Sequence, residues 1–190
     1  VSDASFDLYE GELVGLIGPN GAGKTTMFNM VSGIYTPTSG QISFWDKDDK
    51  VHVINKLGPA QLNKLGVART FQNIRLFGEL SVKDNVLIAL HNQRRVSVFD
   101  VLFRTPKFRR DEQVMSEKAM NLLELFKISG KADEKAKNLP YGEQRKLEIV
   151  RALASNPKLL LLDEPAAGMN PQETKELMEL IAFIRKEFKL

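Results

Sequence analysis

The chain has 190 residues, of which 43% are hydrophobic, enough for one sizeable domain with a buried core. Its 27 basic and 24 acidic residues leave a net charge of +3, a mixed composition that does not by itself indicate a polyanionic partner. The absence of cysteine excludes disulfides, and no apolar stretch approaches the roughly 20 residues of a membrane span, so we expect a soluble protein of a reducing compartment.

The N-terminal part of the chain is predicted to combine strands with one helix. Apolar and polar residues alternate around Phe6 and Leu8, and an apolar run follows at 13–17. A glycine-rich loop then leads into a helix that we expect to end near Gly33. The expected elements are strands at 6–8, 13–17, 42–44 and 67–71 and a helix from about Lys24 to Ser32.

The middle of the chain is predicted to be helical and to interrupt an α/β core. Residues 81–84 (Ser-Val-Lys-Asp) have the form of a capping box, and apolar side chains then recur at helical spacing. These stripes are Val82, Val86 and Leu90 or Ala89; Met115, Ala119, Leu122 and Phe126; and Leu147, Val150 and Ala154 or Leu153. Four leucines at 159–162 predict a buried strand, and Asn170 followed by Pro171 predicts the start of a last helix.

The loop at 18–25 matches the phosphate-binding pattern G-x-x-x-x-G-K-[ST]. It lies between an apolar run and a helix, the context in which curled backbone amides and the helix dipole hold a phosphate. Lys24 is expected to bridge the terminal phosphates, and the Thr25 hydroxyl to hold Mg²⁺. We therefore predict that the chain binds a nucleoside triphosphate, in preference to a chance glycine turn. The predicted nucleotide-binding residues are Gly18, Pro19, Asn20, Gly21, Ala22, Gly23, Lys24, Thr25 and Thr26.

Two acidic residues, Asp163 and Glu164, follow the leucine strand at the edge where α/β sheets place their ligand chemistry. A phosphate loop with such an acidic strand end is the usual pair for phosphoryl transfer. We predict that Asp163 orients Mg²⁺ through water and that Glu164 polarises the attacking water as general base. Lys24 and Mg²⁺ would offset the charge that develops in the transition state. Taken alone, acidic residues after an apolar strand are as often structural.

Two further segments make the pattern more specific. Gln72 follows a predicted strand, and residues 139–146 (Leu-Pro-Tyr-Gly-Glu-Gln-Arg-Lys) open the helix before the acidic strand. The order of phosphate loop, strand-end glutamine, helical insert, signature loop and acidic strand resembles the ATPase subunit of ABC transporters over essentially the whole chain. The residues at 70–77, 139–149 and 163–171 are similar to one branch of that family, the ATP-binding subunit of branched-chain amino acid import systems.

The resemblance implies a fold class: α/β, a P-loop NTPase with a RecA-like core and a small antiparallel β subdomain, interrupted by an ABC-type helical subdomain. It divides a single ABC ATPase module into a nucleotide core at 1–73 and 155–190 and a helical subdomain at about 74–154. The family's adenine-stacking aromatic and switch histidine would lie before Val1 and beyond Leu190, so the module is expected to be truncated at both ends. The subunit is expected to be peripheral, at the cytoplasmic face of the cell membrane.

The resemblance also implies partners and site residues. A second ATPase subunit, identical or different, would assemble head to tail, with each ATP between the phosphate loop of one copy and the signature loop of the other. Transmembrane permease subunits would contact residues 73–80, where Phe77 is either an anchor or a core residue, and a periplasmic or extracellular solute-binding protein would act indirectly.

The cofactors that the resemblance implies are ATP and Mg²⁺. The implied residues are Glu164, Lys24 and Gln72 for catalysis, Thr25, Gln72 and Asp163 for the metal, and Leu139, Pro140, Tyr141, Gly142, Glu143 and Gln144 for the signature loop.

The chain departs from the family's commonest signature, Leu-Ser-Gly-Gly-Gln, at three positions. Pro140 and Tyr141 replace the serine and the first glycine, and Glu143 replaces the glutamine. A carboxylate beside a triphosphate is unfavourable unless it points away or interacts with the helix dipole instead. Asn170 also stands where many relatives hold aspartate, and a plain helix cap explains it equally well.

One alternative function stays open, a soluble ABC-type ATPase that acts on nucleic acid or ribosomes. Basic residues interleaved with phenylalanines could bind nucleic acid or anionic lipid, although a solvated helical face with inward aromatics is favoured. This cluster comprises Arg94, Arg95, Arg104, Lys107, Arg109 and Arg110 with Phe99, Phe103 and Phe108. The sequence holds neither a second ATPase module nor a long coiled-coil insertion, so no nucleic-acid partner is expected.

Overall fold

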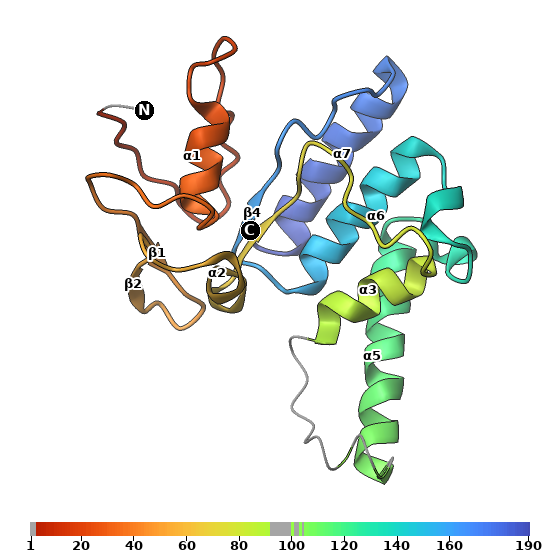
Figure 1. The fold of residues 1–190 in the computed structure, drawn as a ribbon. Helices are drawn as coiled ribbons and strands as arrows, with labels where there is room; N and C mark the ends of the chain where they lie inside the picture. The colour runs from red at the N-terminus through yellow and green to blue at the C-terminus, as the bar shows by residue number, and fades with distance from the viewer. Residues whose placement is uncertain (1–2, 92–99, 101–102, 104) are drawn as a thin grey trace. The chain divides into compact units, whose positions relative to one another are not determined.

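The computed structural model describes residues 3–91, 100, 103 and 105–190 (Figure 1). Contacts within the chain divide it into two compact units, one of residues 1–72 and 156–190 and one of residues 73–155. Within the described ranges, every helix is too short or too polar to span a lipid bilayer.

The first unit contains two pairs of strands and three helices. Its elements are helix α1 (Lys24–Val31), strands β1 (Ser43–Trp45) and β2 (Val51–Val53), helix α2 (Pro59–Leu65), strands β3 (Val67–Arg69) and β4 (Leu159–Leu161), and helix α7 (Pro171–Glu187). β1 and β2 are antiparallel, whereas β3 and β4 are parallel with Arg69 opposite Leu161. Since parallel strands end at the same edge, the residues that follow β3 and β4 lie close together. The strands predicted at 42–44, 67–71 and 159–162 are confirmed, each in a three-residue form.

An apolar core joins the hairpin, α2 and the parallel pair. Ile54, Leu62 and Val67 are at most 4% exposed and form its centre. The half-buried side chains packed around them are Ile42, Phe44, Leu57, Leu65, Leu159 and Leu161. Gly33, just after α1, has a φ of +73°, and a Cβ there would lie 2.3 Å from the Leu57 carbonyl oxygen. Only glycine therefore fits where the end of α1 meets this core.

The strands predicted at 6–8 and 13–17 are wrong. In the part of the chain that the structure describes, neither segment belongs to a strand ladder. The side chains of the apolar run are exposed, with Leu13 at 55% and Ile17 at 95%. Strand structure is stabilised by cross-strand pairs and by burial of a face. This segment has neither, so its alternating pattern and apolar run do not produce a strand.

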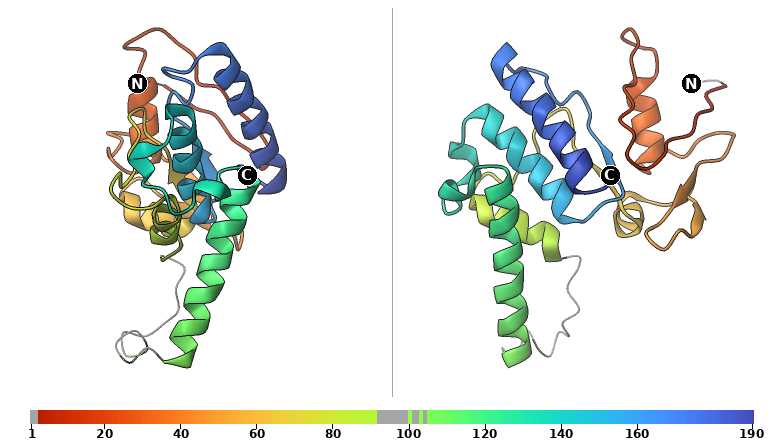
Figure 2. Two further views of the ribbon diagram at one scale, coloured as in Figure 1. Left: turned by 90° about the vertical axis from the view of Figure 1, so that its right-hand side faces the viewer. Right: turned by 180° about the vertical axis from the view of Figure 1, so that it is seen from behind.

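The second unit is helical. It contains α3 (Val82–Leu90), α5 (Pro106–Leu125) and α6 (Tyr141–Ala154), with short 3-10 turns η2 (Ser129–Lys131) and η3 (Ala136–Asn138). α3 packs against both α5 and α6. In Figures 1 and 2 the C-terminal half of α5 lies beside α3 and α6, and its N-terminal half extends beyond them. The predicted apolar stripes are buried in this core, except that Leu123 takes the fully buried place expected for Leu122.

Three helices begin with a side-chain cap. Ser81 Oγ accepts from the amide of Asp84 at 2.9 Å, and Thr105 Oγ1 accepts from that of Phe108 at 3.3 Å. Asn170 Oδ1 accepts from the amide of Glu173, whose carboxylate accepts in return from the Asn170 amide, both at 2.9 Å. The helix starts predicted at 81 and 170 are thus confirmed, and Asn170 is a helix cap.

Candidate functional site

The loop before α1 has the backbone of an anion-binding turn. Gly21 and Gly23 have φ of +83° and +91°, which disfavours any residue with a Cβ. A Cβ on Gly18 would lie 3.1 Å from that of Ala22. Since α1 has no side-chain cap, its first-turn amides keep the capacity to bind an anion.

The ammonium of Lys24 lies over this same loop. Its Nζ donates to the carbonyl of Gly18 at 2.6 Å and to that of Pro19 at 2.9 Å. Thr25 is exposed in the first turn of α1. The loop thus combines positive-φ glycines, a helix start and a cation within eight residues, a set of groups suited to a polyphosphate.

Two predicted catalytic residues meet where β3 and β4 end. Gln72 Nε2 donates to Glu164 Oε2 at 2.8 Å, although the two residues are 92 positions apart. The parallel pairing of β3 with β4 produces this contact, because it sets both chain exits at one edge. The amide therefore holds the carboxylate that we predict to act as general base.

Glu164 has a strained backbone. Its φ of +45° lies in the left-handed region, where a non-glycine residue costs about 1–3 kcal/mol. The amide of Ala167 donates to its carbonyl at 3.0 Å and closes the turn. The side chain is exposed, so the carboxylate is accessible to water as well as to Gln72. Strain of this kind clusters at functional sites.

Asp163 pairs with an arginine that the sequence analysis missed. Its Oδ2 accepts from Arg69 Nη2 at 2.7 Å, and the aspartate side chain is 16% exposed. The available signal was a charged residue at the end of a short apolar strand, three positions before Gln72.

The predicted metal ligands offer the oxygen atoms that Mg²⁺ prefers. Thr25, Gln72 and Asp163 carry hydroxyl, amide and carboxylate oxygens. No group of three or more His, Cys, Asp or Glu residues that could hold a metal occurs in the described part of the chain. Because Mg²⁺ at nucleotides uses one or two carboxylates together with phosphate oxygens, this donor set fits an ion that arrives with the nucleotide.

The predicted signature residues 139–144 form the entry to α6 in the second unit. Lys131 Nζ lies 2.8 and 2.6 Å from the two carboxylate oxygens of Glu143. Gln144 Nε2 donates to the carbonyl of Leu139 at 2.8 Å. Pro140 precedes the helix without a side-chain cap, and Tyr141 is 43% exposed. The charge of Glu143 is thus compensated within its own unit, and the N-cap residue Pro140 supplies no side-chain acceptor to the first-turn amides of α6.

The segment after Gln72 is fixed by a buried asparagine. Asn85, 0% exposed, accepts from the Phe77 amide at 2.9 Å and donates to the Phe77 carbonyl at 3.0 Å. The Phe77 ring is 50% exposed, with the Arg151 guanidinium 5.6 Å from its centroid. Burial lowers the pKa of Arg151 below its usual value, and the nearby charge of Glu148 offsets only part of this effect. Phe77 is therefore a surface side chain on a fixed backbone.

The basic cluster is only partly described. Lys107, Arg109 and Arg110 lie in the first turns of α5, whereas Arg94, Arg95, Arg104 and Phe99 lie outside the described residues.

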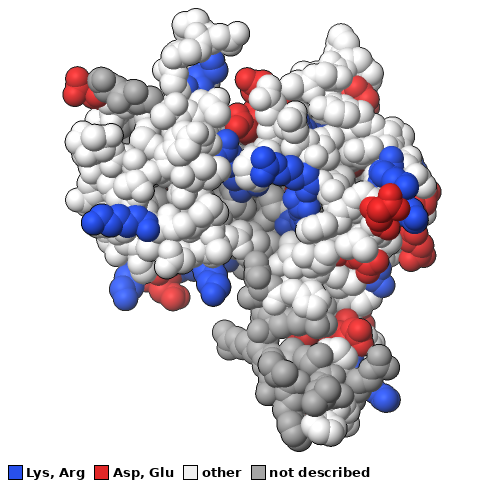
Figure 3. Space-filling model, in the orientation of Figure 1, with Lys and Arg blue, Asp and Glu red and all other residues white. Residues whose placement is uncertain are grey.

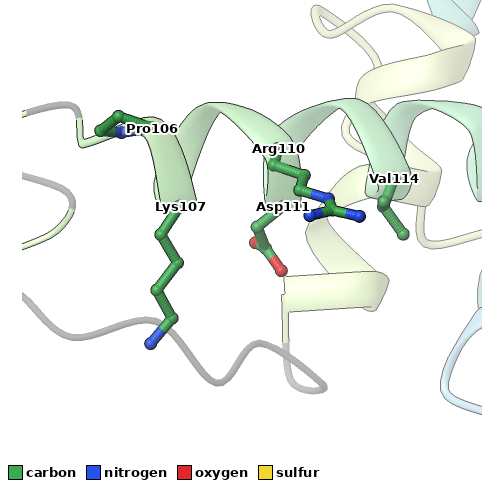
Figure 4. A pocket seen from close by; sticks show the side chains of 5 residues that line it. All are labelled: Pro106, Lys107, Arg110, Asp111 and Val114. Atoms are coloured by element: carbon green, nitrogen blue, oxygen red, sulfur yellow. The ribbon is translucent and has the colours of Figure 1, made fainter.

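A hollow of about 450 Å³ at the N-terminal end of α5 holds none of the predicted site residues. It is lined by Pro106, Lys107, Arg110, Asp111 and Val114. Lys107 and Asp111 project from the same side of the helix (Figure 4). Acidic and basic side chains lie side by side on part of the face shown in Figure 3.

Comparisons with known proteins agree with this geometry. Residues 1–167 match the ABC transporter family. The chain is 46% identical over 185 residues to the high-affinity branched-chain amino acid transport ATP-binding protein LivG of Escherichia coli K12, covering 97% of this chain and 71% of that protein. A solved ADP conformation of an ATP-binding cassette of an ABC transporter is 33% identical with a TM-score of 0.75, covering 94% of this chain and 67% of that one. A dimeric ATP-binding cassette bound to ADP and Pi is 26% identical with a TM-score of 0.73, covering 97% and 74%.

These similarities confirm the predicted resemblance and the predicted fold class, an α/β P-loop NTPase with a small antiparallel sheet. That sheet is the β1–β2 pair.

Proposed function

Since this chain belongs to the ABC transporter family and is one of its ATP-binding ATPases, we propose that it powers the import of branched-chain amino acids through a membrane permease. The contact between Gln72 and Glu164 carries the chemical part of the proposal, because it joins a candidate general base to the end of a neighbouring strand. The name of the 46% identical relative supplies the solute class.

The residues of the first unit have separate roles in this proposal. The loop 18–25 binds the triphosphate, and Lys24 exchanges its two carbonyl partners for phosphate oxygens. Thr25, Gln72 and Asp163 would hold Mg²⁺, which neutralises phosphate charge when bound. Glu164 accepts a proton from the attacking water, and Gln72 keeps the carboxylate aimed at that water. Glu164 needs no backbone rearrangement for this role, because its strained turn is already formed.

A head-to-tail pair of ATPase subunits accounts for the second unit. At the entry to α6, the N-cap residue Pro140 supplies no side-chain acceptor for the first-turn amides, and the charge of Glu143 is compensated by Lys131. This entry therefore suits a phosphate that another copy already holds. The dimeric relative bound to ADP and Pi supports the pairing of two ATPase subunits.

The remaining partners follow from the transporter role. Permease subunits would contact the exposed Phe77 in the segment 73–80, and a solute-binding protein would act indirectly through them. The subunit would then lie peripherally, on the cytoplasmic face of the membrane. The units 1–72 with 156–190 and 73–155 correspond in this proposal to the nucleotide core and the helical subdomain, a division that the contacts within the chain support.

Uptake measurements test the proposal in the native organism. Deletion of the gene should abolish uptake of labelled leucine, isoleucine and valine, and wild-type protein should restore it. Lys24→Ala should not restore it, whereas Lys64→Ala, an exposed lysine of α2, should. Unchanged uptake after deletion would refute the solute class. Recovery of the protein with ribosomes or RNA instead of membranes would favour the alternative function.

A further inference from the structure

Arg69, the last residue of β3, carries a nearly buried charge in the first unit. Its side chain is 7% exposed. Nη1 donates to Asn29 Oδ1 at 2.7 Å and to Ser32 Oγ at 2.8 Å, both on or directly after α1. Nη2 donates to Asp163 Oδ2 at 2.7 Å, just after β4. One guanidinium therefore joins the helix that follows the phosphate loop to the acidic end of β4.

The surroundings of Arg69 fix its orientation. The guanidinium carbon lies 5.6 Å from the centroid of the Phe28 ring and 5.1 Å from that of Phe71, close enough for cation–π attraction. The Ser32 hydroxyl donates to the carbonyl of Phe28 at 2.7 Å, so its oxygen is available to accept from Arg69. A planar guanidinium held by rings and acceptors loses little further freedom when it binds a carboxylate, so it is well suited to orient one.

The pairing leaves Asp163 arranged for a second ligand. Among the described residues, the side-chain bond of Asp163 runs through Oδ2 to Arg69, and Oδ1 of the same carboxylate remains for Mg²⁺ or for a water bound to it. Outer partners that orient a metal ligand commonly change metal affinity by about 10- to 100-fold when they are removed.

We propose that Arg69 is a positioning residue that fixes the Asp163 carboxylate for the Mg²⁺ that accompanies ATP and couples it to the helix of the phosphate loop. This inference rests on the proposed function, since it requires ATP and Mg²⁺ at this site. It assigns Arg69 no contact with the nucleotide. Its removal should therefore weaken the metal step and leave the metal-free binding of the triphosphate to the loop nearly unchanged.

Calorimetric titration of the purified protein with a non-hydrolysable ATP analogue separates these steps. In EDTA, Arg69→Met should bind the analogue within about twofold of wild type, because the groups of the phosphate loop are intact. With increasing Mg²⁺, the concentration that gives the half-maximal gain in affinity should rise by about 10- to 100-fold. Arg69→Lys should show most of the same loss, because an ammonium cannot reproduce the planar arrangement of N–H donors of the guanidinium. Lys158→Met is the matched control. Lys158 directly precedes β4 and pairs with Asp49, so its replacement should leave the Mg²⁺ dependence unchanged.

A double-mutant cycle tests whether Arg69 acts through Asp163. In an Asp163→Asn background, Arg69→Met should no longer change the Mg²⁺ dependence. If Arg69→Met does not fold, Ser32→Ala removes one acceptor of the guanidinium and should shift the Mg²⁺ dependence in the same direction. A folded Arg69→Met or Ser32→Ala variant with wild-type Mg²⁺ dependence would overturn the inference. Wild-type protein that binds no ATP analogue in EDTA or in Mg²⁺ would overturn the proposed function instead.

Discussion

Among the described α-helices, α1, α2 and α6 begin without a side-chain cap, whereas α3, α5 and α7 begin with Ser81, Thr105 and Asn170. A cap satisfies first-turn amides that would otherwise need another acceptor. The capped starts of α3 and α5 follow segments with no assigned ligand, whereas Asn170 ends the loop that begins with the predicted site residues Asp163 and Glu164. The uncapped starts of α1 and α6 follow the two loops that the proposed function places against a triphosphate, whereas that of α2 follows no predicted site residue.

The starts of α1 and α6 also differ from each other. α1 follows glycines with positive φ and begins with Lys24, so it brings both amides and a cation to an anion. α6 follows Pro140 and carries Glu143 in its first turn, with the charge compensated by Lys131. The first loop can hold a phosphate by itself, whereas the second offers only amides to a phosphate held elsewhere. Binding should therefore depend on α1, and hydrolysis on both.

The largest expected effect separates binding from chemistry. Glu164→Gln should lower ATP hydrolysis by about 10²- to 10⁴-fold, the usual contribution of a general base, because an amide cannot accept the proton of the attacking water. ATP affinity should stay close to wild type, and the variant should accumulate as an ATP-bound dimer. Phosphate release and size-exclusion chromatography measure the two effects, with Glu179→Gln on the exposed face of α7 as control. Normal hydrolysis by Glu164→Gln would show that another group activates the water.

Removal of the α1 cation should act on binding itself. Lys24→Ala should weaken ATP binding by about 100-fold or more, because charge-assisted hydrogen bonds to phosphate each contribute on the order of 2–3 kcal/mol. Titration calorimetry measures the affinity, and Lys64→Ala controls for loss of a positive charge elsewhere in the unit. Unchanged ATP affinity of Lys24→Ala would mean that the loop before α1 binds phosphate through its amides alone. The proposed difference from the loop before α6 would then be lost.

Local sequence rules predicted the features that depend on neighbouring residues. The phosphate loop and the caps at Ser81 and Asn170 are set by side chains within a few positions of one another. The positions of Gln72 and Glu164 at strand ends were predicted as well, but their contact is seen only in the structure, where the parallel pairing of β3 with β4 places the two exits together.

Contacts between distant residues were not predictable in the same way. Arg69 reaches Asp163 across 94 positions and Asn29 across 40, and no short pattern marks either partner. Nor does any local signal select Lys131 as the partner of Glu143. The apolar run 13–17 is a case in which a local signal was misleading. Its composition favours a strand, but in the described residues no other strand pairs with it.

An intermediate effect should appear at the entry to α6. Lys131→Met leaves the Glu143 carboxylate without its cation, so repulsion of a nearby phosphate should lower ATP hydrolysis by about 3- to 10-fold at limiting ATP. Binding to the isolated subunit should not change, because α1 holds the nucleotide there. The double variant Lys131→Met with Glu143→Gln should recover most of the activity. A loss that the second substitution does not repair would mean that Lys131 acts through the fold of the loop and not through the charge of Glu143.

The smallest effect is expected at the capped helix α7, where a substitution should lower the stability of the protein and leave ATP binding unchanged. Asn170→Ala removes the acceptor for the Glu173 amide at the start of α7 and should destabilise the protein by about 1 kcal/mol, as loss of a cap typically does. Asn170→Asp keeps the acceptor and should retain stability. Urea unfolding measures both, and ATP affinity should be unchanged in each. If Asn170→Ala instead alters hydrolysis at unchanged stability, the cap of α7 contributes to the site as well as to the fold.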